Sequence, residues 1–340
     1  MRQSNAELLR ILSMMFVVMV HLDGAALSLP TISGDFDALT SRELWKLSAQ
    51  SITIVGVNCF TLISGYFGIR ASMRGFLKLT FLCLFYSVGI ATAFYLYDTI
   101  HSGTTFPWQN WCESWLVYSH TDLWYVPAYL GLYLLSPLLN ATEQTFSNRR
   151  FAAIVGSFTL FTVWCGWWWG GRFNPTGYTV MQLILMYLIG AGVRRFTATF
   201  DQRQRIRTLI LGVGIYLAGT AATFLISLYL DPINAFAYNS PAVIAASTGL
   251  LMTFTSFGMR SHTVNRIAAS AFAVYLIHKN PLIWVRHIKP LANKVWELVD
   301  WQQYTLLVIG FTLAVYAICW MIDLLRIQIE KMVFRIPLKR

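Results

Sequence analysis

The chain has 340 residues, of which 56% are hydrophobic and only 12% are charged, whereas about 25% of the residues in an average soluble domain are charged. This balance excludes a soluble globular protein. Apolar runs of about 20 residues recur along the whole length, and each is long enough to cross a bilayer as a helix. No stretch is left over for a soluble domain, so we expect residues 1–340 to form one integral membrane domain in contact with membrane lipids.

The formal net charge of the chain is +11. A strongly basic balance can indicate a nucleic-acid partner, but the basic residues here lie in short segments between apolar runs and do not form a soluble basic surface. Their placement follows the rule that cytoplasmic loops of membrane proteins are enriched in Lys and Arg. The charge therefore indicates topology, and we expect no nucleic-acid partner.

The five cysteines show no Cys-x-x-Cys spacing. Four of them lie inside apolar runs, and only Cys112 lies in a loop. Neither a disulfide framework nor a zinc site is indicated. We therefore expect no metal and no permanently bound cofactor.

Apolar windows between charged or Pro/Gly-rich breaks predict an all-α, polytopic membrane helix bundle with about ten transmembrane helices. The predicted spans are residues 8–28, 49–69, 76–97, 121–139, 151–169, 177–193, 208–230, 242–259, 266–285 and 304–325. If the N-terminus is cytoplasmic, 19 of the 26 Lys and Arg residues fall on the cytoplasmic side. This bias favours that orientation, and an even number of spans then places both termini in the cytoplasm.

The longer loops, residues 29–48, 98–120 and 286–303, all fall on the outer side in this topology. Two tryptophan-rich stretches, residues 106–115 and 164–171, lie at the same boundary. They are interpreted either as an aromatic belt at the level of the lipid headgroups or as a platform on which sugar rings stack. Both interpretations stay open on the sequence.

The first predicted span carries two ionisable residues on one face. Arg10 and His21 are eleven residues apart, so in a helix their side chains differ by about 20° around the axis and by about 16 Å along it. Arg10 would stand at the cytoplasmic mouth, where its planar guanidinium can bind the phosphate oxygens of a ligand. His21 would lie just beyond the midplane, where burial favours the neutral imidazole that a general base requires.

Each of these residues also has a structural interpretation. A buried histidine can simply bridge two helices by a hydrogen bond, and an arginine at a helix end commonly extends to the headgroups. Ionisable groups at membrane depth are costly, however, and usually mark a function. Asp23 does not share the helical face of His21, so a group that orients the ring must come from another span. Asn58, in the second span, is a candidate. Its alternative role is a hydrogen bond that holds two helices together, here called interhelical glue.

The stretch AELLRILSMMFVVMVH (residues 6–21) resembles the opening motif of the membrane-bound acyltransferase 3 family. Three further stretches are similar to that family in the expected order: NCFTLISGYFGI (58–69), LWYVPAYLGLYLLSPLLN (123–140) and FAVYLIHKNPLI (272–283). The resemblance extends from about residue 5 to residue 325. It implies transfer of an acyl group, usually acetyl, from cytoplasmic acyl-CoA to a hydroxyl of a cell-envelope glycan or lipid-linked sugar, in the bacterial cytoplasmic (inner) membrane.

The resemblance also implies roles for particular residues. It makes His21 the essential histidine and Arg10 its paired arginine. An Arg-x-Arg pair that many members have after the second span is absent here, and the nearest basic residues are Arg70 and Arg74. We expect these two to share a helical face if their segment is helical and, with Arg10, to bind the phosphates of acetyl-CoA, although they also fit the charge bias of cytoplasmic loops.

We expect the acceptor to approach His21 from the outer side. Residues that offer aromatic faces or hydrogen bonds to a glycan are Asn58, Trp124, Tyr125, Tyr129, Tyr275, His278 and Asn280. Each of them can also be an interface anchor or a packing residue. The alternative function is a transporter or flippase for a glycan or lipid intermediate, because intramembrane Arg and His also mark transport pathways; a glycan polymerase would require larger outer loops.

Overall fold

The computed structural model describes residues 3–30, 39–119, 122–168, 173–229 and 232–334. Throughout these residues the only regular structure is helical, which confirms the all-α class. The longer helices are α1 (Ser4–Val20), α4 (Met73–Ser102), α6 (Tyr125–Thr145), α7 (Asn148–Thr162), α8 (Val180–Thr197), α9 (Gln202–Tyr229), α11 (Pro241–Thr255) and α16 (Trp301–Val333). The shorter ones are α2 (Ser41–Thr53), α3 (Gly56–Phe67), α5 (Trp108–Glu113), α10 (Pro232–Ala235), α12 (His262–Ala268), α13 (Ala271–His278), α14 (Pro281–Ile283) and α15 (Lys289–Leu298).

In the described part of the chain, seven helical segments are long and apolar enough to cross a membrane. They are Ser4–Gly24, Ser41–Phe67, Met73–Ser102, Asn148–Trp168, Val180–Thr197, Gln202–Tyr229 and Trp301–Val333. Each overlaps a predicted span, and α6 and α11 overlap two more. The bundle of membrane helices is therefore confirmed, whereas the count of ten and the cytoplasmic placement of both termini stay predictions.

The continuous span predicted over residues 266–285 is wrong. The structure divides this stretch into α12, α13 and α14 and then into η5, a π-helix over Trp284–Ile288. The break after α13 has a local cause, because the residue before a proline is disfavoured in the α-helical conformation. Asn280, which precedes Pro281, has φ −54° and ψ 129°, and its side chain accepts a hydrogen bond from the Leu282 amide at 3.0 Å to start the next helix.

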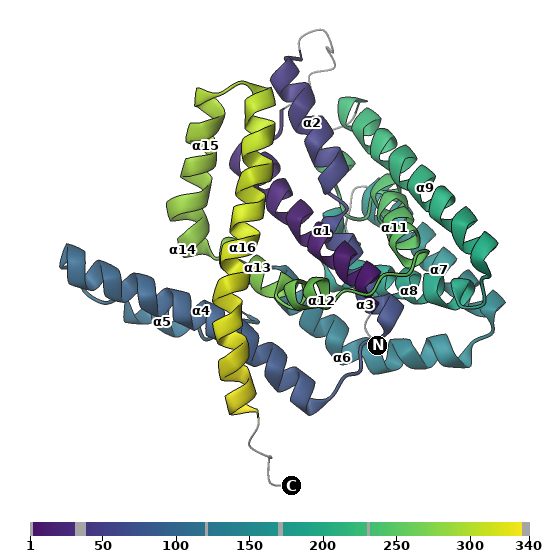
Figure 1. The fold of residues 1–340 in the computed structure, drawn as a ribbon, viewed down its shortest axis with the longest axis horizontal. Helices are drawn as coiled ribbons and strands as arrows, with labels where there is room; N and C mark the ends of the chain where they lie inside the picture. Colours follow the sequence, from purple (N-terminus) through teal and green to yellow (C-terminus); the bar gives the residue numbers. More distant parts are fainter. Residues whose placement is uncertain (1–2, 31–38, 120–121, 169–172, 230–231, 335–340) are drawn as a thin grey trace.

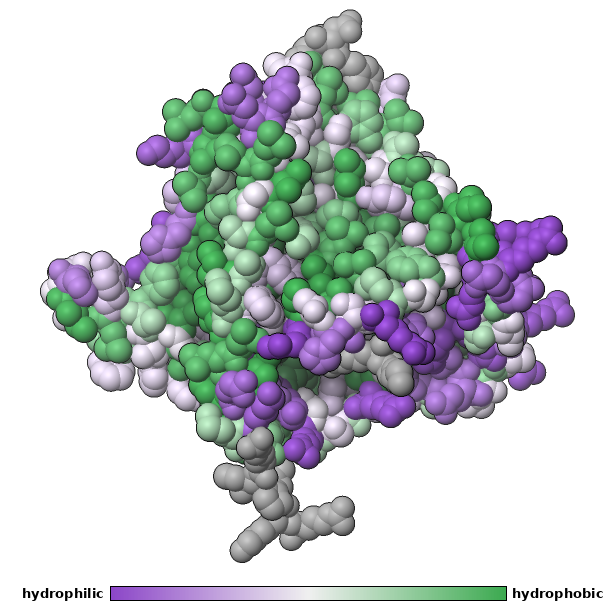
Figure 2. Space-filling model, in the orientation of Figure 1, coloured by the Kyte–Doolittle hydropathy of each residue, from purple (hydrophilic) through white to green (hydrophobic). Residues whose placement is uncertain are grey.

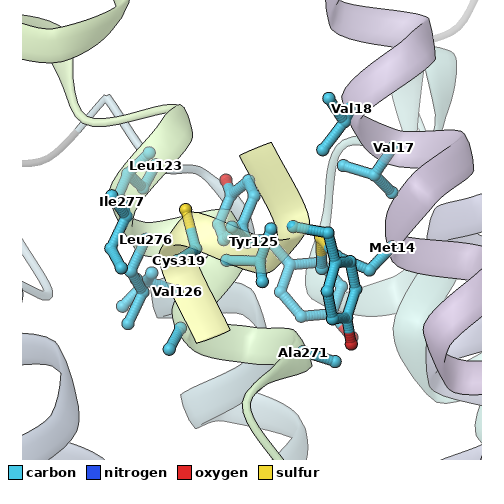
Figure 3. Packing of buried hydrophobic residues seen from close by; sticks show 14 of the residues in the cluster. Met14, Val17, Val18, Leu123, Tyr125, Val126, Ala271, Leu276, Ile277 and Cys319 are labelled. Atoms are coloured by element: carbon cyan, nitrogen blue, oxygen red, sulfur yellow. The ribbon is translucent and has the colours of Figure 1, made fainter. Parts of the chain in front are cut away.

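Helix α1 occupies the centre of the bundle (Figure 1). It packs against α3, α11, α12, α13 and α16. Its first turn is held by Asn5, whose Nδ2 donates to the carbonyls of Phe254 and Phe257 at 2.6 and 2.7 Å. Figure 3 shows how the core is built beside α1, with Tyr125 of α6 between the side chains of Met14 and Val17 and those carried by α13.

Helices α3 and α8 touch through their backbones. A Cβ added to Gly190 would overlap the Leu62 carbonyl, and one added to Gly65 would overlap the Tyr187 carbonyl. Small residues allow this close approach, which is a common way to join helices in membranes because packing has to replace the hydrophobic driving force. The two helices therefore form a closely joined pair on one side of α1.

Helices α4 and α16 form the outer rim on the opposite side (Figure 1). Asp323 of α16 is fully buried. Its carboxylate accepts hydrogen bonds from the Tyr86 hydroxyl at 2.7 Å and from Arg326 Nε at 2.8 Å. Lys78 and Glu330 add an ion pair at 2.9 Å. A buried carboxylate is tolerated because these donors replace the lost water, so the network fixes how α4 crosses α16.

The surface matches that of a membrane protein. Figure 2 shows hydrophobic residues over the middle of this face and hydrophilic residues at its lower and right edges and at its upper left. Exposed tryptophans in the two tryptophan-rich stretches are Trp108, Trp115, Trp164 and Trp168; residues 169–171 of the second stretch lie outside the described residues. Their exposure leaves both the belt and the platform interpretations open.

Candidate active site

The centre of the candidate site is a pair of histidines. His21 Nδ1 lies 3.0 Å from His278 Nε2. His21 is partly exposed, whereas His278 is 1% exposed. The side chain within hydrogen-bonding distance of His21 is therefore His278, on another helix, whereas Asn58 bonds to Tyr238 and Gln182.

Helix α1 brings His21 to this position. The α-helix ends at Val20, and His21 opens η1, a π-helix over His21–Ala26. Single π-turns inside α-helices occur frequently at functional sites. Asp23, in the same turn, is fully buried, and neither of its carboxylate oxygens has a hydrogen-bond partner among the described residues. Asp23 thus does not orient His21, in agreement with its place on the helix.

His278 is held by the end of α13. Its Nδ1 donates to the Val274 carbonyl, one turn earlier, at 2.6 Å. The helix stops directly after His278, because Asn280 and Pro281 turn the chain away. Non-helical backbone at membrane depth is tolerated where it is buried in protein or lines a cavity, and here the break places a histidine beside the first span.

Aromatic rings surround the pair. Tyr275 stacks on His21 with ring centres 6.4 Å apart, and Trp284 meets His21 edge-on at 5.9 Å. The amine of Lys279 lies 4.1 Å from the centre of the Trp284 ring, a cation–π contact. These rings leave His21 little freedom to rotate.

A narrow cavity of about 20 Å³ opens beside His21. It is lined by Met14, Val17, His21, Val57, Phe60, Trp124, Tyr125, Tyr238, Phe272 and Tyr275. A volume of this size holds about one water molecule. A ligand larger than a water molecule can therefore reach His21 through this cavity only after some of these side chains have moved.

Arg10 lies on the same stripe of α1 as His21. The spacing from Arg10 through Met14 and Val17 to His21 is four, three and four residues, which keeps all four on one helical face. The guanidinium of Arg10 is ion-paired with Glu7 of the preceding turn. The pairing leaves other donors of the guanidinium fork for an anionic ligand.

The predicted substrate-binding residues separate into three groups. Trp124, Tyr125 and Tyr275 line the cavity beside His21, and His278 contacts His21 itself. Tyr129 stacks on Tyr125, with ring centres 5.7 Å apart, outside the cavity lining. The remaining two residues, Asn58 and Asn280, do not reach the cavity.

Asn58 belongs to a buried network between helices. It is 0% exposed, its Nδ2 donates to the Tyr238 carbonyl at 2.8 Å, and its Oδ1 accepts from Gln182 Nε2 at 3.3 Å. Gln182 Nε2 also donates to the same carbonyl at 2.8 Å. The contacts match the interhelical glue that was the alternative role for Asn58, and they position Tyr238 at the cavity.

Asn280 lines a separate, wider cleft of about 590 Å³ beside α13 and α14. Polar residues in its wall include Tyr95, Asn110, Glu113, Ser119 and Asp122. Leu276, two residues before His278, also lines it. This polar cleft therefore borders the helix that carries His278.

Arg70 and Arg74 were expected to share a helical face only if their segment is helical, and this condition is not met. Gly68 has φ +75°, which ends α3, and the chain stays non-helical until α4 begins at Met73. The Tyr187 hydroxyl accepts a hydrogen bond from the Ile69 amide at 2.8 Å, and Asn140 Nδ2 donates to the Ile69 carbonyl at 2.8 Å. Arg70 is exposed in this segment, whereas Arg74 Nη2 donates to the Phe334 carbonyl at 2.9 Å.

A basic cleft of about 1110 Å³ lies at the end of the bundle where α1 begins. Three arginines line it, Arg194 of α8, Arg205 of α9 and Arg260 after α11, together with Gln3 and Asn5. Arg194 is ion-paired with Glu143 at 2.5 Å. It also approaches Gly68, because a Cβ there would lie 3.6 Å from Arg194 Nη1. The cleft and the segment that carries Arg70 therefore adjoin.

A family model, described as an acyltransferase domain of type 3, matches residues 4–324 of the chain. The chain belongs to the acyltransferase 3 family. The match covers nearly the whole chain and confirms the resemblance seen in the sequence. No curated protein and no solved structure matches the chain. The chain is therefore a membrane acyltransferase, built from apolar helices.

Sequence reasoning missed several parts of this acyltransferase. It did not find the contact of His21 with His278, nor Trp284, Lys279 and Tyr238 around it. It also missed the basic cleft, because Arg194, Arg205 and Arg260 were interpreted only as a topology signal. The one signal in the sequence was the YLIH stretch at residues 275–278, which pointed to His278 but not to its contact with His21. Among the described residues, no group of three His, Cys, Asp or Glu side chains is placed to hold a metal ion.

Proposed function

We propose that this acyltransferase transfers an acyl group, in the simplest case acetyl, from acyl-CoA to a hydroxyl of a cell-envelope glycan. The observation that carries the proposal is His21, the histidine of the family's opening motif, beside a cavity in the middle of the bundle and on the stripe that starts at Arg10. A neutral imidazole at this place can act as general base towards a hydroxyl.

The proposed reaction takes place at His21. The acceptor oxygen attacks the thioester carbonyl carbon while its proton passes to the imidazole. The carbon–sulfur bond then breaks, and the proton moves from the imidazolium to the departing CoA thiolate. His21 returns to its neutral form, so the cycle consumes no other reactant.

The donor's phosphates are proposed to bind at the end of the bundle where α1 begins. The basic cleft offers Arg194, Arg205 and Arg260, with Arg70 on its border and Arg10 farther along α1. Guanidinium groups bind phosphate oxygens through pairs of parallel hydrogen bonds. Arg74, which contacts the end of α16, is the least suited of the predicted donor-binding arginines. In the proposed topology this end faces the cytoplasm of a bacterial inner membrane, where acyl-CoA is found.

The acceptor is proposed to enter from the other side, through the polar cleft that Asn280 lines. Its wall of tyrosine, asparagine, serine and carboxylate groups suits a hydroxyl-rich ligand, because each group can exchange hydrogen bonds with a sugar. The cleft borders α13, so a glycan bound there lies next to the helix that carries His278. Trp124, Tyr125 and Tyr275 would then contact the reacting sugar at the cavity.

The test combines an assay with product analysis. Purified chain in lipid nanodiscs is incubated with radiolabelled acetyl-CoA and an envelope glycan fraction, and label transferred to glycan is counted. Mass spectrometry of glycans from cells with and without the chain then identifies the sugar that gains one acetyl group. A flippase would move its ligand without consuming acetyl-CoA, so failure to consume any acyl-CoA with every glycan fraction contradicts the proposal.

A further inference from the structure

The hydrogen bonds around His278 determine where its proton lies. Nδ1 of His278 is 2.6 Å from the Val274 carbonyl oxygen. A carbonyl oxygen only accepts hydrogen bonds, so Nδ1 of His278 must carry the hydrogen. In the neutral ring the other nitrogen, Nε2, then holds a lone pair and is an acceptor.

This assignment passes to His21. The acceptor Nε2 of His278 faces Nδ1 of His21 at 3.0 Å. A hydrogen bond across this distance requires one hydrogen, and only His21 Nδ1 can supply it. A neutral His21 that is protonated at Nδ1 has its lone pair at Nε2.

We infer that His278 is a positioning residue that fixes His21 in the Nδ1–H tautomer, so that Nε2 of His21 is the atom that takes the proton from the acceptor hydroxyl. This inference rests on the proposed function for the identity of the reaction, but the tautomer itself does not depend on it. His278 touches neither donor nor acceptor in this scheme. It acts through His21, as the outer partners of catalytic and metal-bound histidines commonly do.

The surrounding residues keep the two hydrogen bonds, from His21 to His278 and from His278 to the Val274 carbonyl, in one arrangement. His278 is 1% exposed, which shields its hydrogen bonds from competing water. Tyr275 and Trp284 pack against His21 and oppose a ring flip that would exchange its two nitrogens. During transfer, when His21 holds the extra proton on Nε2, its Nδ1–H continues to donate to His278. The same hydrogen bond therefore orients the base and stabilises the imidazolium that forms.

The test observes the tautomer directly. The full chain is labelled with ¹⁵N-histidine and placed in nanodiscs without substrate, and the His21 signals are assigned by their loss in the His21→Ala variant. We expect the ring ¹⁵N shifts of His21 to show a protonated Nδ1 and an unprotonated Nε2 at a pH where the ring is neutral. A neutral His21 with its hydrogen on Nε2 overturns the inference.

Variants of His278 separate positioning from mere packing. His278→Leu removes the acceptor, and we expect His21 to lose its fixed Nδ1–H form and kcat to fall about 10–100-fold, as for other outer partners of functional histidines. His278→Gln offers an amide oxygen to His21 Nδ1, so it should restore the tautomer and part of kcat. His262→Ala, at an exposed histidine, is the control and should change neither.

The outcomes distinguish this inference from the proposed function. If His278→Leu does not fold, the wild-type spectrum and His278→Gln still decide the tautomer. An unchanged His21 tautomer in folded His278→Leu contradicts the positioning role. If instead the tautomer is as expected but His21→Ala keeps full acyl transfer, the proposed general base is wrong, whereas the inference that His278 fixes the tautomer of His21 is still supported.

Discussion

His21 and His278 are 257 residues apart in the chain, yet their ring nitrogens Nδ1 and Nε2 lie 3.0 Å apart. The contact joins the first membrane helix to a short helix near the end of the chain, and it does so beside the cavity where Tyr125 and Tyr275 meet α1. Tyr275 contacts both rings, and Trp284 contacts His21. The pair therefore links the helix that carries the family motif to the broken segment α12–α14.

Replacing His21 with alanine is expected to remove most acyl transfer. Loss of a general base typically costs about 10²–10⁴-fold in rate, and no other imidazole except His278 contacts this position among the described residues. The measurement is single-turnover transfer from radiolabelled acetyl-CoA, with folding checked by thermal unfolding. His262→Ala should behave like the wild type. Near-normal transfer by a folded His21→Ala protein contradicts the mechanism.

Reversing a charge in the basic cleft is expected to weaken donor binding. Arg205→Glu removes a guanidinium from the cleft wall and adds a like charge beside the donor's phosphates. One charge-assisted hydrogen bond contributes about 1.5–3 kcal/mol, so KM for acetyl-CoA should rise about tenfold or more while kcat changes little. The matched control is Lys294→Glu, an exposed residue on α15. An equal KM in the two variants would place the donor elsewhere.

Two glycine substitutions, one in the α3–α8 contact and one outside it, are expected to have different effects on stability. Gly190→Ala forces its new methyl group against the Leu62 carbonyl, and overpacking of this kind costs about 1–3 kcal/mol. Gly214→Ala, on α9, meets no atom within 4 Å, so the higher helix propensity of alanine should keep or raise stability. Thermal unfolding in the same detergent compares the two. A melting temperature that Gly190→Ala leaves unchanged argues against the close helix pair.

Substitution of Asn58 distinguishes its two predicted roles. As interhelical glue, Asn58→Ala leaves Gln182 with one partner fewer, and the loss of buried hydrogen bonds costs about 1–3 kcal/mol. We expect a lower melting temperature with an unchanged KM for the glycan acceptor. A raised acceptor KM at unchanged stability would instead support direct substrate binding by Asn58.

Helix periodicity and hydropathy predicted much of the fold. Long apolar windows locate the membrane helices because burying twenty apolar residues in lipid outweighs most local preferences. The same periodicity places Arg10 and His21 on one stripe, since α1 is regular between them. The prediction failed over residues 266–285, where Asn280 and Pro281 end a helix inside an apolar run. Averaged hydropathy cannot register a single backbone break of this kind.

The site was only partly predictable, because the residues that contact His21 come from other helices and meet it only in the folded chain. Sequence spacing excluded Asp23 as the group that orients His21, but it could not select His278 over Asn58, since both lie in other helices. Arg70 and Arg74 failed as a helical pair for a local reason, the left-handed Gly68 that ends α3. The basic cleft was not predicted because its three arginines come from α8, from α9 and from the segment after α11, and they meet only in the folded chain.

The shared backbone surface of α3 and α8 has a consequence for turnover. At Gly65 and Gly190 the two backbones meet directly, so α3, which lines the cavity at Val57 and Phe60, is not expected to move independently of α8. We therefore expect the cavity beside His21 to widen on its other side, where aromatic side chains of α6 and α13 face α1. A gate formed by such rings opens by rotamer change and helix displacement, steps slow enough to limit turnover in many enzymes. The pace of acyl transfer in this chain is thus expected to follow the mobility of Tyr125, Phe272 and Tyr275.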